Sequence, residues 1–202
     1  MTSIPYRSSD ECPLVSRAVS MENHCAHWAL TNLSVAIYRC RADRRWTMTV
    51  LTEGIYNLTG YPAVDLLENA RLSFESLIVP QDRQRVRREV FTALENRRPF
   101  AIKYRFITAD QTVRWIYDQG QGYWDEADNL QYLDGILSDI TDHKQVEERL
   151  QLLYEACEQS PASIVITNCQ GTIQYVNPKF EAITGFSAAE VMGQNPRILK
   201  TG

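Results

Sequence analysis

The sequence has no long apolar run. None of its 202 residues belongs to an uninterrupted apolar stretch of the ~18 positions that a membrane-spanning helix needs, and the N-terminus lacks the apolar core of a secretory signal. These two absences predict a cytoplasmic protein without a membrane span.

Paired cysteines are absent as well. The cysteines are odd in number, and no two of them have the CxxC spacing of zinc sites and redox-active pairs. A disulfide framework and a structural zinc site are therefore not expected, and the thiols are predicted to be reduced. The cysteines are Cys12, Cys25, Cys40, Cys157 and Cys169.

Excess positive charge and the common catalytic motifs are also missing. The formal net charge of −4 gives no basic surface for nucleic acid to bind. The chain contains no glycine-rich phosphate loop, no GxSxG turn, and no Ser-His-Asp arrangement that sequence alone nominates as catalytic. With 44% apolar and 23% charged residues, it is predicted to be an ordinary folded protein that binds no nucleic acid and catalyses no reaction by itself.

One pattern occurs twice. "NLTGYPAVDLLEN" (57–69) and "AITGFSAAEVMGQN" (182–195) share an apolar residue, Thr, Gly, an aromatic residue, small residues, an acid and two apolar residues. Each copy follows an alternating apolar run, at 34–41 and at 163–177, which is typical of β-strands. The repeat predicts two modules, each of which opens with a β-hairpin.

The first module continues with a helix and three strands. The segment 80–96 has apolar residues at helical spacing, with proline in the first turn. Two alternating runs and a last strand at 131–139 follow it. The apolar positions of the two runs are Ile102, Tyr104 and Phe106, then Val113, Trp115 and Tyr117. The pattern predicts an α+β domain, a five-stranded antiparallel sheet with helices on one face.

The second module is shorter than the first. After its copy of the repeat, the sequence has no counterpart of the long helix or of the last three strands. A two-stranded sheet is marginally stable alone, so we expect this unit to be loosely folded or supported by its neighbour. The chain is interpreted as a fragment or a truncated reading frame.

Several motifs resemble one family in order and spacing. In the first module they are "YNLTGYPAVDLL", "VPQDRQRV", "YRFITADQTVRWIYDQG" and "LDGILSDITDHKQVEERLQ", and in the second "SPASIVITNCQGTIQYVNPKFEAITGF" and the residues after it. They resemble PAS (Per-Arnt-Sim) sensory domains with their C-terminal PAC motif. The resemblance implies a flanking, partly helical segment (1–29), a first PAS domain (30–141), a coupling helix (142–159) and the N-terminal part of a second, truncated PAS domain (160–202).

The resemblance also implies a function. Tandem PAS domains are typical of the sensory region of a bacterial signalling protein, here most simply a sensor histidine kinase whose enzyme activity lies in another domain. Two alternatives stay open. One is the input region of a cyclic-di-GMP synthase or phosphodiesterase, because "GQNPRILKTG" occurs before such output domains. The other is a stand-alone protein-interaction module that binds no ligand.

In this family the last strand commonly ends in an Asp-Ile-Thr tripeptide, here Asp139, Ile140 and Thr141, from which a helix carries the signal onward. We expect Asp142 to cap that helix, with Gln145 three residues later. Apolar residues then follow at 4-3-4 spacing and predict a coiled-coil seam, hence a homodimer. The apolar seam consists of Val146, Leu150, Leu153 and Cys157. The alternative is a monomeric connector that lies against a sheet.

The sequence argues against two familiar cofactors. Where photoreactive flavin modules of the family have a cysteine, "GQNPRILK" has Pro196, and the first module lacks this stretch. Haem sensors place a histidine on the long helix, but residues 80–96 contain none. The ligand is thus unknown. The candidates for lining a cavity around a small apolar ligand are Tyr104, Phe106, Trp115 and Tyr117, although aromatic residues at strand spacing are more often ordinary core.

Two polar clusters have alternative interpretations. His24, Cys25 and His27 are adjacent on a predicted helix, but they do not complete a metal site, so an amphipathic flanking helix is expected and no metal is predicted. His143 lacks the flanking residues of a phosphorylated histidine and is predicted to be solvated. The arginines of the long helix could bind an anion, but acids interleave with them, which favours a solvated face. These arginines are Arg83, Arg85, Arg87, Arg88, Arg97 and Arg98.

Overall fold

The computed structural model describes residues 35–200, which form two compact units that divide between Thr141 and Asp142. Predictions for residues 1–34 lie outside the described residues. The strands of the first unit are β1 (Val35–Cys40), β2 (Met48–Leu51), β3 (Phe100–Ile107), β4 (Val113–Trp124) and β5 (Leu130–Asp139). Its described helices are α2 (Gly54–Thr59), α3 (Ala63–Leu66), α4 (Phe74–Leu77) and α5 (Pro80–Glu95).

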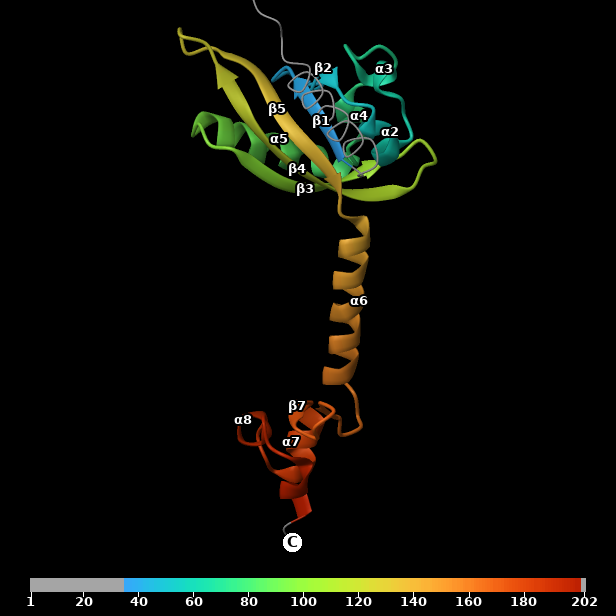
Figure 1. Cartoon of the computed structure of the whole chain (residues 1–202), viewed down its shortest axis with the longest axis vertical. Helices are drawn as coiled ribbons and strands as arrows, with labels where there is room; N and C mark the ends of the chain where they lie inside the picture. The colour runs from blue at the N-terminus through green and yellow to red at the C-terminus, as the bar shows by residue number, and fades with distance from the viewer. Residues whose placement is uncertain (1–34, 201–202) are drawn as a thin grey trace, which may run out of the picture. The chain divides into compact units, whose positions relative to one another are not determined.

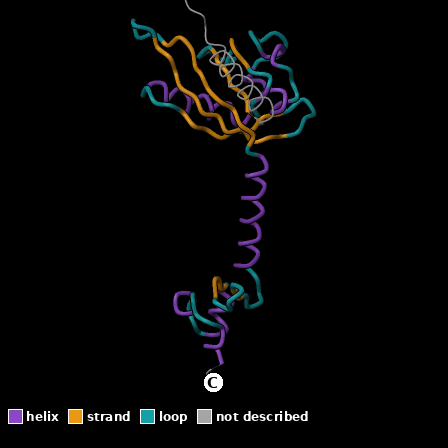
Figure 2. The backbone as a smooth tube through the Cα atoms, viewed as in Figure 1, coloured by secondary structure: helices purple, strands orange, loops and turns teal. Residues whose placement is uncertain are grey.

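The five strands form one antiparallel sheet in the order β2-β1-β5-β4-β3 (Figure 1; Figure 2). Strands β3, β4 and β5 follow one another as hairpins, whereas β1 and β5 are distant in sequence and pair at the centre. In that pair Tyr38 lies opposite Gly135. The last strand of the sheet along the chain, β5, therefore joins its two halves, and the end of β5 lies beside β4.

The core lies between one face of the sheet and the helices, with α5 packed on β3 and α2 on β1. Strand β3 alternates as the sequence predicts, because Ile102, Tyr104 and Phe106 are all buried. The ring of Phe106 meets those of Phe74 and Tyr104 edge to face, with centroids 5.2 and 5.4 Å apart. The α+β prediction and the five-stranded antiparallel sheet are confirmed.

Helix α5 begins at Pro80, which fits the first turn because proline has no N–H to donate. Val86, Val90 and Leu94 are buried at helical spacing, as predicted. Asp82 is buried too, and it receives the Arg105 guanidinium at 2.9 and 3.0 Å together with the Arg105 backbone N–H. These hydrogen bonds hold the pKa of Asp82 below its ordinary value.

Helix α6 (Thr141–Glu158) follows the sheet directly, one residue earlier than the predicted start at 142. Further along the chain are β6 (Val165–Thr167), β7 (Ile173–Val176), α7 (Pro178–Thr184), α8 (Ala188–Val191) and the 3₁₀ helix η1 (Pro196–Lys200). The two strands pair as the predicted hairpin. A small cluster holds these elements together: Ile173, Val176, Phe180 and Val191. None of the described helices is long and apolar enough to span a bilayer.

Candidate functional site

The junction between β5 and α6 is built from the tripeptide Asp139, Ile140 and Thr141. The Ile140 N–H donates to the carbonyl of Trp115 at 2.9 Å, and the Trp115 N–H donates to Thr141 Oγ1 at 3.0 Å. Asp139 Oδ1 accepts the Thr141 N–H at 2.8 Å and also the Thr141 hydroxyl. The first residue of α6 is thereby bonded to the backbone of β4.

This geometry corrects the predicted helix cap. Asp142 was expected to cap α6, but the helix already includes Thr141, so Asp142 lies within its first turn. The carboxylate that accepts an N–H at this end belongs to Asp139, three residues earlier in the chain. The physical reason is that Asp139 is still in β5, close to β4, and can serve the sheet and the helix at once.

Arg114 completes the junction, and the sequence interpretation did not single it out. Its guanidinium donates to the Asn57 carbonyl at 2.7 Å and lies 3.3 Å from Asp139 Oδ2. It thereby links the short helix α2 to the end of β5. The stretch "TVRWIYDQG" gives no local signal of this contact, because Asn57 and Asp139 are distant from Arg114 in sequence.

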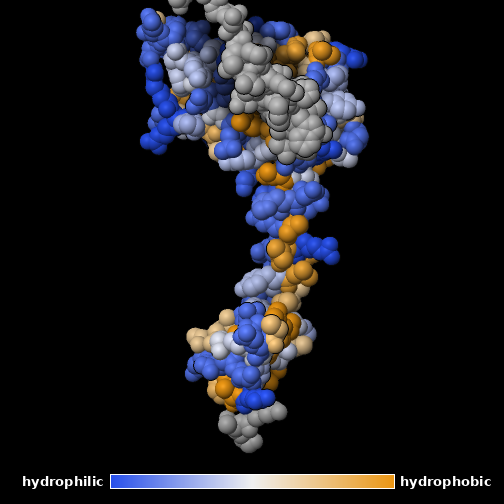
Figure 3. All heavy atoms as spheres, in the orientation of Figure 1, coloured by the Kyte–Doolittle hydropathy of each residue, from blue (hydrophilic) through white to orange (hydrophobic). Residues whose placement is uncertain are grey.

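The predicted seam lies along the surface of α6. Val146, Leu150 and Leu153 have exposed fractions of 58%, 62% and 55%, and Cys157 is partly buried. No residue of α6 is buried. Figure 3 shows apolar side chains along the visible face of this helix. Three of the four seam positions, which would be core in a packed helix, are thus left largely to solvent in a single chain.

Within the second unit, the end of α6 is bonded to the segment around β7 by Asn177, which is fully buried. Its Nδ2 donates to the carbonyls of Cys157 and Ala162 at 3.0 and 2.9 Å. Its Oδ1 accepts the N–H groups of Ile164 and Phe180 at 2.9 and 3.1 Å. All four hydrogen bonds that a side-chain amide of this kind forms readily are made, so α6 is tied at this end as well.

Tyr175 gives a second contact at the same end. Its hydroxyl donates to Glu158 Oε1 at 2.6 Å, and its ring meets that of Tyr154 edge to face at 6.1 Å. Neither Asn177 nor Tyr175 was predicted to have a role. The sequence "YVN" at the end of β7 indicates that Asn177 caps the next helix. It does not indicate which carbonyl groups the Asn177 amide binds.

The four aromatic residues proposed to line one cavity lie on two faces of the sheet. Tyr104 and Phe106 are fully buried in the core. On β4, however, the core positions are Ile116 and Asp118, so Trp115 and Tyr117 point to the other face, where Arg105 and Lys103 lie over their rings. The four residues do not share a cavity. On β4 the residues that face the core are Ile116 and Asp118, each one position after the predicted Trp115 and Tyr117.

The core itself is closely packed. Between β1, β3 and α5 there is space of only about 20 Å³, lined among others by Tyr38, Cys40 and Tyr104. This is room for about one water molecule. Burial raises the pKa of the Cys40 thiol above its ordinary value, so it is protonated.

Asp118 is the polar side chain at the centre of this core, with 4% of its surface exposed. Its Oδ1 accepts the hydroxyl of Tyr38 at 2.9 Å and its Oδ2 the hydroxyl of Tyr104 at 2.7 Å. Burial raises the pKa of Asp118 to about 7, although the two hydrogen bonds oppose the rise. The burial of Asp118 was not predicted, because an acid in an alternating strand is normally assigned to the solvent face.

Gly135 makes this arrangement possible. The Tyr38 ring lies flat over its backbone, and an added Cβ at Gly135 would be 2.5 Å from Cζ and Oη of the tyrosine. Only glycine leaves the room for the phenol to pass over β5 and reach Asp118 on β4.

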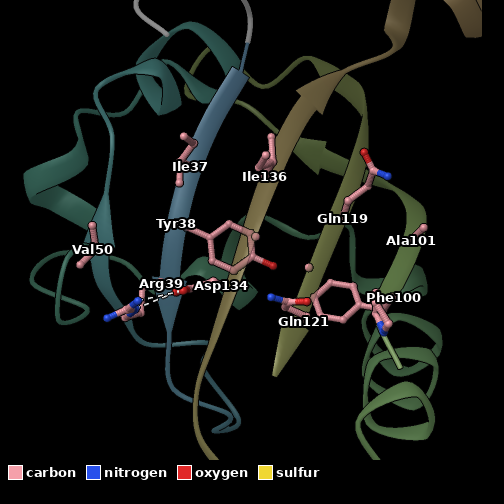
Figure 4. A pocket seen from close by; sticks show the side chains of 13 residues that line it. Ile37, Tyr38, Arg39, Val50, Phe100, Ala101, Gln119, Gln121, Asp134 and Ile136 are labelled. Carbon is pink, nitrogen blue, oxygen red and sulfur yellow. Dashed lines mark hydrogen bonds and ion pairs between the residues drawn. The ribbon is translucent and has the colours of Figure 1, made fainter. Parts of the chain in front are cut away.

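The opposite face of the sheet has a shallow hollow of about 670 Å³. Figure 4 shows Ile37, Ile136 and Gln119 on neighbouring strands around it, and the ion pair of Arg39 with Asp134 at 2.7 Å. Ile136 is 47% exposed. The described residues that line the hollow are apolar and polar, and none of them is a buried charged group that marks a ligand.

The arginines of α5 do not form an anion site. Arg83 donates to the Ile78 carbonyl at 2.9 Å, Arg85 to the Lys103 carbonyl at 2.8 Å, and Arg87 to Glu75 at 2.9 Å. The predicted solvated face is therefore only partly right, since these three are half-buried and connect α5 to its neighbours.

Some of the residues considered as metal or cofactor ligands lie within the described part of the chain. His24, Cys25 and His27 lie outside the described residues, His143 is exposed on α6, and Pro196 begins η1. Within residues 35–200, no three His, Cys, Asp or Glu side chains gather as metal ligands.

Comparison with known proteins identifies the family of this helix-covered sheet with its Asp-Ile-Thr junction. The family described as PAS fold matches the chain twice, over residues 48–137 and over residues 148–200. The chain belongs to the PAS family. The first PAS match lies in the first unit, and the second begins within α6 and extends through η1.

Relatives of this PAS chain include sensors and a cyclase. The sensor protein FixL of Bradyrhizobium diazoefficiens is 30% identical over 130 residues, which are 62% of this chain and 26% of FixL. The probable diguanylate cyclase DgcE of Escherichia coli is 26% identical over 120 residues, 57% of this chain and 11% of DgcE. The chain therefore spans about a quarter of one relative and about a tenth of the other.

A solved structure gives a similar result. The sensory box histidine kinase/response regulator from Burkholderia thailandensis superposes with a TM-score of 0.53 at 26% identity, covering 63% of this chain and 93% of that one. The sequence-based resemblance to PAS sensory domains is thereby confirmed.

Proposed function

We propose that this chain is a sensory and dimerisation region, in which the first PAS unit detects a ligand or partner and α6 relays its state to the second unit and to an output domain. The observation that carries the proposal is the bonding of α6 at both ends. Thr141 is bonded to the backbone of β4 and Cys157 to the buried Asn177.

The proposed relay begins at the junction between β5 and α6, where a movement of the sheet would move the helix. Asp139 and Thr141 bind each other and β4, and Arg114 links them to α2. A shift of β4 relative to β5 would displace the acceptor of the Trp115 N–H and so the first turn of α6. A two-state element of this kind is what signal transmission by helix rotation or register change requires.

Thr141→Val tests the junction, because valine keeps the shape of threonine and removes the acceptor of the Trp115 N–H. We expect amide exchange of Trp115 and of the first turn of α6 to become about tenfold faster, since a half-buried N–H loses its hydrogen bond to Thr141. Ser138→Ala is the matched control: Ser138 lies at the same end of β5 but donates only to the Tyr117 carbonyl at 3.4 Å. Equal exchange in Thr141→Val and wild type would refute the relay.

The occupant proposed for the seam of α6 is a second copy of the chain. In a parallel pair, Val146, Leu150 and Leu153 of each helix would face the same residues of the other, and their 4-3-4 spacing suits this packing. Their exposed fractions of 58%, 62% and 55% mean that a dimer would remove apolar surface from water without breaking any contact.

Leu150→Lys tests the dimer. We expect it to raise the dimer dissociation constant at least about tenfold, measured by analytical ultracentrifugation of the full chain, because it places two ammonium groups against each other in the seam. Glu148→Lys, an exposed position away from the seam, should have little effect. If wild type sediments as a monomer at all concentrations, or both variants weaken the dimer equally, the seam is not the interface.

We further propose that the output domain is that of a sensor histidine kinase, in line with the Burkholderia structure. A cyclic-di-GMP synthase is the second candidate, favoured by the similarity to DgcE. The third is an interaction module without a ligand, favoured by the closely packed core with its space of about 20 Å³. Ligand binding detected by native mass spectrometry would reject the third.

A further inference from the structure

Asp118 joins three parts of the first unit through one carboxyl group. It lies on β4, and its two oxygens accept hydroxyl groups from Tyr38 on β1 and Tyr104 on β3. Because β5 lies between β1 and β4, the Tyr38 bond crosses a whole strand, over Gly135. The carboxyl therefore ties the strands on both sides of the centre of the sheet.

Among the residues that the structure describes, no positive charge faces this carboxyl. The ionisable groups around it are Tyr38 and Cys40 from β1 and Tyr104 from β3, and burial raises the pKa of each, so they are neutral. The other described side chains that line this space are apolar or aromatic, among them Phe74 of α4, Val86 and Val90 of α5, and Leu133 of β5. An ionised Asp118 is stabilised by two hydroxyl groups alone, which is a weak substitute for water or a cation.

We propose that Asp118 is a proton-binding site through which the first unit responds to pH, by exchanging the hydrogen bonds that tie β1 and β3 to β4. The carboxylate accepts both tyrosine hydroxyls. When it takes up a proton from solvent, it gains an O–H that must itself be donated, so at least one tyrosine hydroxyl has to turn or leave. The two protonation states therefore hold the strands differently.

The proton site lies close to the junction with α6. Asp118 pairs with Leu137 in β5, and only Ile116 and Tyr117 separate it from Trp115, whose N–H and C=O bind Thr141 and Ile140. Through this link, protonation of Asp118 would be the stimulus that the proposed relay transmits. In this respect the inference rests on the proposed function. The binding of the proton itself does not depend on the relay.

The sign of the pH effect follows from the direction of the shift. Burial raises the pKa of Asp118 in the folded chain to about 7, above the value of about 3.9 for an exposed aspartate. The folded state therefore binds the proton more tightly than the unfolded state. The contribution of Asp118 to stability is fully present below about pH 4 and is lost as the pH rises through about 7.

Infrared spectroscopy of the full chain, which follows the C=O band of a protonated carboxyl, tests the site. We expect a band in wild type that disappears with a midpoint between about pH 6 and 8, and its absence in Asp118→Asn. In Tyr104→Phe the midpoint should rise by about one unit, because the carboxylate loses one of its two hydrogen bonds. This second variant keeps the test decisive should Asp118→Asn fail to fold.

A midpoint below about pH 5, a band that persists in Asp118→Asn, or an unchanged or lowered midpoint in Tyr104→Phe would overturn the proposal. Thr141→Val separates it from the relay: its midpoint should equal that of wild type, because the variant breaks the junction and leaves the proton site intact. A failed proton site and a failed relay therefore give different results.

Discussion

Replacing Asn177 with alanine is expected to lower the free energy of unfolding of the second unit by about 4 kcal/mol, since four hydrogen bonds of a buried amide are lost at ~1 kcal/mol each. The apolar cluster that remains, around Ile173 and Phe180, is small. We therefore expect the second unit to unfold first, in a separate transition at lower denaturant concentration. Circular dichroism and amide exchange of residues 160–200 would measure it.

The matched control is Asn195→Ala, which makes the same chemical change at an exposed position whose side chain accepts only the Arg197 N–H at 3.1 Å. It should change stability by less than about 1 kcal/mol. An effect of Asn177→Ala no larger than that of Asn195→Ala would show that α6 is not held by this amide.

Gly135→Ala is expected to destabilise the first unit by about 3 kcal/mol. The new methyl group would lie 2.5 Å from Cζ and Oη of Tyr38, so the ring must move. The move breaks the hydroxyl bond to Asp118 and leaves the Tyr104 hydroxyl as the one remaining donor of the pair that binds this buried carboxyl. Denaturant unfolding followed by tryptophan fluorescence would measure the loss.

A double-mutant cycle isolates the cause. In a Tyr38→Ala background there is no ring above Gly135, and the same Gly135→Ala change should cost less than about 0.5 kcal/mol. An equal cost in both backgrounds would show that glycine is needed there for its backbone and not for the passage of Tyr38.

Local pattern predicted much of the fold. The alternation of Ile102, Tyr104 and Phe106 predicts β3 and its buried face, and the spacing of Val86 and Val90 predicts α5. The repeat around the two "TG" pairs predicts a second hairpin. These features follow from the chain's own periodicity, which a sequence carries without its partners.

The interior of the site could not be predicted in the same way. On β4 the sequence offers two alternating sets, and the aromatic set looks like core, yet the structure buries Ile116 and Asp118. In this arrangement two hydroxyls, from Tyr38 on β1 and Tyr104 on β3, satisfy the buried Asp118, and contacts between strands distant in sequence leave no periodic signal. Arg114 and Asn177 were missed for the same reason, since their partners are carbonyl groups that any residue provides.

The relay through α6 is tested most directly by amide exchange of the second unit in the Thr141→Val chain. Loosening the start of α6 should disturb the bond from Asn177 to the Cys157 carbonyl, so we expect severalfold faster exchange at Ile164 and Phe180, whose N–H groups Asn177 accepts, and none in Ser138→Ala. If the faster exchange is confined to Trp115 and the first turn of α6, the helix does not couple the two units.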